Sequence, residues 1–142
     1  MRRNAQIKDA ALTMTRTLTL VTVFAAAPAL AETPAAAPDY YVDALFAVST
    51  AELLVNFCGD VGLSTERLNA QAEAVLDRLS EDGFAGDEIV HLSGVEDGVA
   101  SRQDAFMARY GLESPTEARI CAAARQEMDE GTAIGAGRVE KN

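Results

Sequence analysis

The two cysteines, Cys58 and Cys121, are the residues whose chemistry the sequence specifies best, and the chain has no others. Each lies on an apolar stripe at helical spacing. In an oxidising compartment such a pair forms a structural disulfide, whereas a reactive thiol needs a basic neighbour or a helix N-terminus to lower its pKa. Cys58 is expected near a helix C-terminus, whose dipole disfavours a thiolate. We therefore predict a Cys58–Cys121 disulfide, which stabilises the fold by roughly 4 kcal/mol through the long loop that it closes.

The other residues that could do chemistry form no catalytic or metal-binding pattern. His91 is the one histidine in the sequence, and a lone histidine is more often a surface or half-buried residue than a catalytic base. The acidic pairs at 87–88 and 96–97 lack the order of a calcium-binding loop. A zinc site would need ligands beyond the two cysteines. We predict no catalytic residues, no metal site and no cofactor, and hence a protein that is not an enzyme.

The N-terminal stretch has the features of a secretory signal peptide. Residues 17–27 form a short apolar run after Arg16, and Ala29 and Ala31 supply the small-x-small pattern of a cleavage site. The run is too short to span a bilayer, which takes roughly 20 apolar residues. We expect cleavage between Ala31 and Glu32, a periplasmic or secreted product, and no transmembrane anchor.

The sequence accordingly divides into three segments. Residues 1–31 are the predicted signal peptide, with translation starting at either Met1 or Met14. Residues 32–38 form a Pro/Ala-rich tether without core residues, which we expect to be disordered. Residues 39–142 are expected to form a single helical domain of a size that supports one modest core.

The charge balance limits the partners. The chain carries 12 basic and 22 acidic residues, a formal net charge of −10, and the predicted signal peptide holds four of the basic residues and one of the acidic ones. Such a charge disfavours nucleic acid and anionic membrane surfaces, which need clustered Lys and Arg. It favours solubility, cations or a partner protein with a basic surface, and the oligomeric state stays open.

Hydrophobic spacing predicts an all-α fold, a small bundle of four main helices plus one short helix, stapled by one disulfide. The main helices are expected over about 39–58, 65–82, 95–110 and 115–130, and the short one at 87–92. No strand-like alternation is present. Residues 132–137 are expected to be flexible, with Ile134 as their anchor on the core.

Two details of these helices follow from local patterns. In the first helix we expect one buried face, because its apolar side chains recur at spacings of three and four; these are Val42, Leu45, Phe46, Leu53 and Phe57. In the last main helix, Ser114 is the expected N-cap, Pro115 takes the first position, and Glu117 completes a capping box.

Several of these features together resemble a known family. They are the stretch 43–46, the cysteine that closes the first helix, the late cysteine helix, and the sequence Gly-Thr-Ala-Ile-Gly at 131–135. The chain is similar to a family of small exported alphaproteobacterial proteins catalogued as a domain of unknown function. The resemblance covers most of the chain after the signal peptide and implies a helical fold with a paired cysteine. It supplies no activity and no site residues.

Three functional hypotheses remain. The first is a non-catalytic periplasmic binding or interaction module that meets another exported protein through its acidic surface. The alternative is a carrier of a small apolar ligand between helices, because the many alanines, together with Met107 and Met128, could leave or line a cavity. Tyr40 and Tyr41 could contact a ligand, although packing at the rim of the core is the simpler role. The third and weakest is an enzyme that uses carboxylates with His91.

Overall fold

The computed structural model describes residues 33–140, so the predicted signal peptide and its cleavage site lie outside the described residues. Within residues 33–140, no helix combines the length and the apolar character that a membrane crossing requires.

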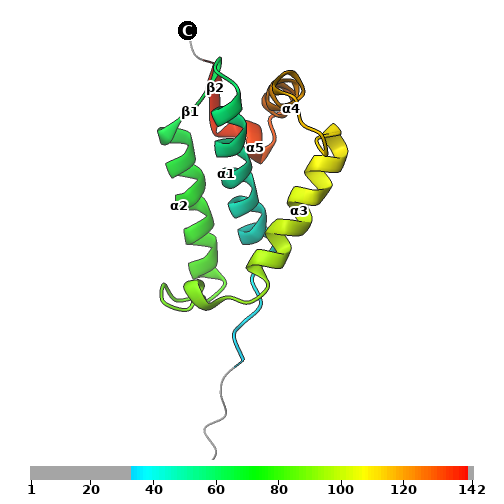
Figure 1. Cartoon of the computed structure of the whole chain (residues 1–142). Helices are drawn as coiled ribbons and strands as arrows, with labels where there is room; N and C mark the ends of the chain where they lie inside the picture. Colours follow the sequence, from blue (N-terminus) through cyan, green and yellow to red (C-terminus); the bar gives the residue numbers. More distant parts are fainter. Residues whose placement is uncertain (1–32, 141–142) are drawn as a thin grey trace, which may run out of the picture. The chain divides into compact units, whose positions relative to one another are not determined.

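The described chain is mostly helical. Its elements are α1 (Asp39–Phe57), β1 (Val61–Leu63), α2 (Thr65–Glu81), the short 3₁₀ helix η1 (Ile89–His91), α3 (Val95–Tyr110), α4 (Glu117–Asp129), α5 (Ala133–Ala136) and β2 (Arg138–Glu140). α2 lies along one side of α1 and α3 along the other, and α1 also packs against α4, α5 and β1 (Figure 1). The predicted helical fold with four main helices is confirmed, with a small two-stranded sheet added to it.

The predicted disulfide is confirmed. Cys58, directly after α1, is bonded to Cys121 of α4, with their Cα atoms 5.4 Å apart and a sequence separation of 63. Cys58 is fully buried, and the bond lies inside the main hydrophobic core. The core residues come from α1, β1, α3, α4 and α5 and from the residues that closely follow α1 and α3; they are Ala47, Ala51, Leu54, Cys58, Val61, Phe106, Leu112, Ile120, Cys121, Ala123, Ala124 and Ile134.

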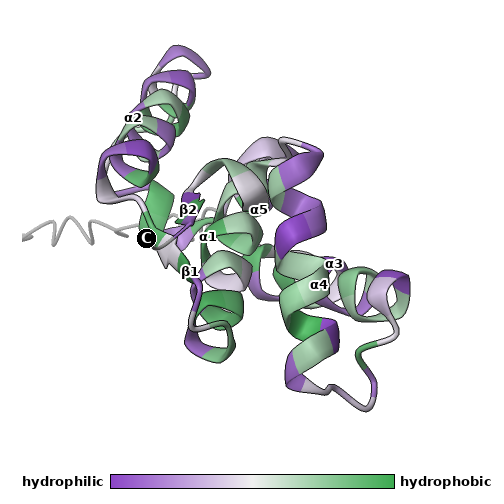
Figure 2. Ribbon diagram, turned by 90° about the horizontal axis from the view of Figure 1, so that it is seen from above, coloured by the Kyte–Doolittle hydropathy of each residue, from purple (hydrophilic) through white to green (hydrophobic). Residues whose placement is uncertain are grey.

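α1 is apolar around its whole circumference, and this changes which of its residues are buried. Figure 2 shows hydrophobic colours along α1, whereas α2 alternates between hydrophilic and hydrophobic turns. The prediction of one buried face is wrong for three of its members: Leu45, Leu53 and Phe57 are 37%, 49% and 50% exposed. With apolar residues on every side, the neighbours that pack against α1 decide which side is covered, and the residue spacing alone does not.

α1 and α3 approach each other closely because a glycine lies at their contact. A Cβ atom on Gly98 would come within 2.7 Å of Cγ1 of Val42, so a larger residue at this position would push the two helices apart. Nearby, the Arg102 guanidinium pairs with Asp43 and, at 3.2 Å, with Asp39. The hydrogen bond to Asp43 is the main reason that the pKa of Arg102 is raised.

The start of α4 differs from its prediction. The helix begins at Glu117, and Thr116 is its N-cap, with a side-chain oxygen that accepts a hydrogen bond from the backbone N–H of Arg119 at 3.4 Å. Thr116 has an extended backbone and caps the helix itself, so Ser114 and Pro115 stay in the preceding turn. The prediction of Ser114 as N-cap is therefore wrong by two residues.

The segment after α4 is ordered, contrary to the expectation of a flexible stretch at 132–137. The Thr132 side chain accepts a hydrogen bond from the backbone N–H of Gly135 and so caps α5. Ile134 is buried, as predicted. β2 then pairs antiparallel with β1, with Arg138 opposite Leu63. Strands of three residues are too short to show the alternation by which a strand is recognised in sequence.

The Pro/Ala-rich tether also makes defined contacts. The backbone N–H of Ala37 donates to the carbonyl of Ser93 at 2.9 Å, and the N–H of Ser93 donates to Ala35 at 2.8 Å. The expectation of disorder is therefore wrong for this part of residues 32–38. Backbone hydrogen bonds hold the segment here, and they leave no trace in the hydrophobic pattern.

We predict that Gly135→Ala destabilises the domain by about 1–3 kcal/mol. A Cβ atom on Gly135 would overlap the carbonyl group of Glu127 and lie 2.7 Å from the backbone nitrogen of Met128, and backbone atoms cannot yield as a flexible side chain can. The measurement is the free energy of unfolding from urea denaturation.

The matched control is Gly86→Ala. A Cβ atom at Gly86 meets nothing within 4 Å, so the free energy of unfolding should change by less than about 1 kcal/mol. An equal loss in the two variants would show that the contact between α5 and α4 is not the cause.

Candidate functional site

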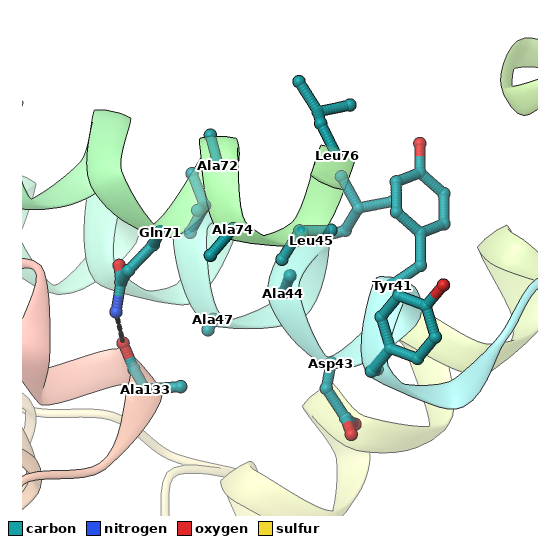
Figure 3. A pocket seen from close by; sticks show the side chains of 13 residues that line it. Tyr41, Asp43, Ala44, Leu45, Ala47, Gln71, Ala72, Ala74, Leu76 and Ala133 are labelled. Atoms are coloured by element: carbon teal, nitrogen blue, oxygen red, sulfur yellow. Dashed lines mark hydrogen bonds between the residues drawn. The ribbon is translucent and has the colours of Figure 1, made fainter. Parts of the chain in front are cut away.

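An apolar groove of about 500 Å³ lies between α1 and α2. Figure 3 shows it from close by, with α2 above and α1 below. A volume of this size is in the range of small-molecule sites in proteins. The groove is lined by Tyr40, Tyr41, Asp43, Ala44, Leu45, Ala47, Val48, Gln71, Ala72, Ala74, Val75, Leu76 and Ala133.

Small residues of both helices line the groove. They include Ala44 and Ala47 on α1 and Ala72 and Ala74 on α2 (Figure 3). Side chains this short cannot fill the space between two helices, so the apolar face of α2 is only partly covered. Leu76, for example, remains 53% exposed.

Polar contacts hold α2 near the two ends of the groove. At one end, the hydroxyl of Tyr40 donates to a carboxylate oxygen of Asp82 at 2.8 Å, and the guanidinium of Arg78 lies 4.0 Å from the centre of the Tyr40 ring. At the other end, Nε2 of Gln71 donates to the carbonyl of Ala133 at 3.4 Å. These contacts set the length of the groove, while the alanines between them set its width.

The groove agrees with the expectations for the two tyrosines and for the alanines, and it corrects the expectation for the two methionines. Tyr40 and Tyr41 both line it, so these residues lie where a ligand would touch them. The alanines leave the space between helices that the carrier hypothesis requires. Met107 and Met128 do not line it and pack instead against the buried core.

The residues considered for catalysis or for metal binding lie elsewhere, and the structure does not bring them together. His91 is exposed in η1. The acidic pairs at 87–88 and 96–97 are exposed too, and one carboxylate oxygen of Glu88 accepts a hydrogen bond from the backbone N–H of Ala85 at 2.9 Å. Across residues 33–140, no group of three or more His, Cys, Asp or Glu side chains is arranged to hold a metal ion.

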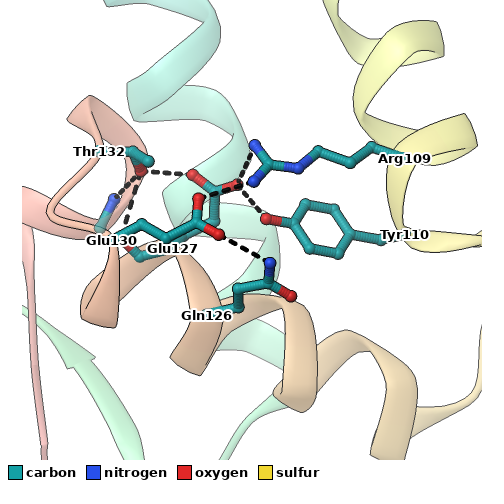
Figure 4. A network of polar contacts seen from close by, with 7 residues as sticks. Arg109, Tyr110, Gln126, Glu127, Glu130 and Thr132 are labelled. Carbon is teal, nitrogen blue, oxygen red and sulfur yellow. Dashed lines mark hydrogen bonds and ion pairs between the residues drawn. The ribbon is translucent and has the colours of Figure 1, made fainter.

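A buried carboxylate, Glu127, forms the centre of the main polar network (Figure 4). Its side chain is 2% exposed. Oε1 accepts a hydrogen bond from the hydroxyl of Tyr110 at 2.5 Å and lies 3.5 Å from the guanidinium of Arg109, and Oε2 accepts from the hydroxyl of Thr132. Burial and the bond to Glu127 raise the pKa of Tyr110 to about 12. Both carboxylate oxygens are thus engaged in tying α3 and α5 to α4.

Arg138 is a second buried charge close to this network. Its side chain is 1% exposed, and Nε donates to the carbonyl of Ile134 at 3.0 Å. The two terminal nitrogens have no hydrogen-bond acceptor among the described protein atoms. Burial lowers the pKa of Arg138, and the negative charge of Glu127 opposes that shift. Glu127 therefore supplies compensating charge to a guanidinium that is buried without a direct ion pair.

The sequence analysis missed both buried charges. A signal for Glu127 was present, because it follows Ile120 by seven residues and Ala124 by three and so falls on the buried side of α4. No comparable signal existed for Arg138, which lies in a strand too short to be recognised. Both residues lie inside the fold, and neither lines the α1–α2 groove.

Comparison with known proteins identifies one family. The model of a family described as "Family of unknown function (DUF5333)" matches residues 33–136. No curated protein and no solved structure matches the chain. The resemblance to a family of unknown function that the sequence predicted is confirmed, while the occurrence of that family in alphaproteobacteria stays a prediction.

We predict that Glu127→Gln lowers the free energy of unfolding by about 2–4 kcal/mol. The amide replaces one acceptor oxygen by a donor, which then faces the donor of Tyr110 or Thr132, and it removes the charge that compensates Arg138. Urea denaturation measures the loss.

Glu130→Gln is the matched control, because Glu130 also pairs with Arg109, at 2.6 Å, but is 38% exposed. Exposed ion pairs contribute little to stability, so this variant should lose only a small part of what Glu127→Gln loses. Similar losses in the two variants would contradict the special role of the buried carboxylate.

Proposed function

The chain belongs to DUF5333, a family of unknown function, and we propose that it is a non-catalytic binding protein that holds an apolar ligand in the α1–α2 groove. The observation that carries the proposal is the groove itself, about 500 Å³ of space lined almost entirely by carbon. Water in such a space has few hydrogen-bond partners, so an apolar ligand displaces it favourably. The alanine-lined gap between helices supports the carrier hypothesis over the other two.

The dimensions of the groove favour a small ligand over a helix from a partner protein. Polar contacts of Tyr40 and of Gln71 limit it at its two ends. An α-helix with its side chains is roughly 10 Å across and would need an open-ended channel. Binding of a basic partner through the acidic surface stays a prediction from composition, without a defined site.

The lack of an assembled catalytic group supports a non-catalytic role. Among the described residues, the most buried carboxylate, Glu127, has both oxygens engaged by hydroxyl groups. His91 is exposed and stands apart from the groove. The groove offers surface and shape to a ligand, and it offers no nucleophile paired with a base.

We also propose that the protein acts in the periplasm or outside the cell. Two independent features support this location. One is the N-terminal sequence, in which a short apolar run precedes Ala29 and Ala31. The other is the disulfide between Cys58 and Cys121, since structural disulfides persist in oxidising compartments.

Mass spectrometry of the protein recovered from the periplasm without reductant tests the location. The expected product begins at Glu32 and is lighter by two hydrogens than the thiol form, because Cys58 and Cys121 are joined. A chain that retains residues 1–31, or one with free thiols, would contradict the proposal.

Fluorescence of N-phenyl-1-naphthylamine, a neutral probe that brightens in apolar surroundings, tests the groove. We expect saturable binding to the wild-type protein. Ala44→Phe and Ala72→Phe fill the space from its two walls and should weaken binding at least about tenfold.

The matched control for these variants is Ala70→Phe. Ala70 is exposed on the same helix as Ala72, and it does not line the groove. The control should bind the probe like the wild type, and circular dichroism checks that all three variants fold. Equal binding by all of them, or no binding by the wild type, would refute the proposed site.

A further inference from the structure

We infer that the ligand of the groove is uncharged, with an apolar body and a hydroxyl or carbonyl group at one end. The inference rests on the proposed function and deepens it, because it names the chemical class of the ligand. It follows from the charges that line the groove, the polar groups at its ends and the hydrocarbon between them.

The walls of the groove offer no free counter-charge to an ionic ligand. Of the 13 lining residues, Asp43 is the one with a charged side chain. Figure 3 shows this side chain directed away from α2, and it is paired with Arg102. Moving a charged group out of water into such surroundings costs free energy that no opposite charge restores.

The surroundings of the groove do not change this conclusion for an anion. Arg78 lies against the Tyr40 ring at one end but is not among the lining residues. Asp82 shares that end and bonds the Tyr40 hydroxyl, so the local charge is balanced. The net charge of −10 on the whole chain repels anions further.

Uncharged polar groups stand at the ends of the groove, where a single polar group of a ligand would meet them. Tyr41 lies at one end and Gln71 at the other (Figure 3). The hydroxyl of Tyr41 makes no hydrogen bond within the described chain, and the Oε1 atom of Gln71 is likewise unbonded there, although its Nε2 atom bonds Ala133. The Tyr41 hydroxyl can donate to a hydroxyl or carbonyl group or accept from a hydroxyl, whereas Oε1 of Gln71 can only accept from a hydroxyl. A pure hydrocarbon has no group that could make either bond.

Displacement of N-phenyl-1-naphthylamine by three ligands with the same ten-carbon chain tests the inference. These are 1-decanol, decanoate and decyltrimethylammonium. We expect 1-decanol to displace the probe at a concentration at least about tenfold lower than either ion.

An apolar site prefers a neutral chain over an ion even without a hydrogen bond. Two variants therefore test whether the groove makes a hydrogen bond to the hydroxyl of 1-decanol. Tyr41→Phe and Gln71→Leu remove the polar group at one end each. One of them should raise the dissociation constant of 1-decanol by about threefold to tenfold, calculated with the probe affinity measured for that same variant. Gln103→Leu, at an exposed position of α3, should change neither the 1-decanol affinity nor the probe affinity.

Each other outcome bears on the inference in a defined way. Strongest displacement by decyltrimethylammonium would overturn it in favour of a cationic ligand at Asp43. Strongest displacement by decanoate would overturn it in favour of an anion at Arg78. If neither variant changes the binding of 1-decanol, the inferred hydrogen-bonding group of the ligand is wrong, while the proposed function stands. Absence of probe binding to the wild type would refute the proposed function and this inference with it.

Discussion

The structure is built around α1, whose apolar residues lie on every side of the helix. The elements α2, α3, α4, α5 and β1 all pack against it, while Leu45, Leu53 and Phe57 stay partly exposed. Burial of apolar surface is the main favourable contribution to folding, and here most of the core residues either belong to this helix or touch it. The remaining elements differ in which side of α1 they cover and in how closely they pack against it.

Two sides of α1 are covered in different ways. On the side of α4, the disulfide and the network around Glu127 fix the neighbours with covalent and buried polar contacts. On the side of α2, alanines of both helices line the groove, and exposed hydrogen bonds such as the one from Tyr40 to Asp82 hold the ends. Close packing on one side and a gap on the other therefore arise from the same helix. The gap has the features of a binding site because its walls keep their hydrocarbon character.

The sequence predicted the features that depend on the chemistry of a residue type or on its spacing along the chain. Two cysteines on apolar stripes sufficed for the disulfide, and helical spacing sufficed for α1, α2 and α3. Prediction from the sequence failed for features that depend on which residues are neighbours in space. The exposure of Leu53 depends on where α3 and α4 run, and the order of α5 depends on the fit of Gly135 against the end of α4. The groove lies between these cases: the alanines suggested a gap between helices, but its place between α1 and α2 required the structure.

The position of α5 late in the chain has a consequence for synthesis. α1 is the first helix to be synthesised among those described, yet part of its surface is covered by α5 (Ala133–Ala136), which follows the other helices. Contacts between segments so distant in sequence form late, because the intervening chain must be brought together first. A nascent chain that ends before these residues therefore exposes apolar surface of α1. Chaperones can bind this surface until the ribosome has synthesised the rest of the domain.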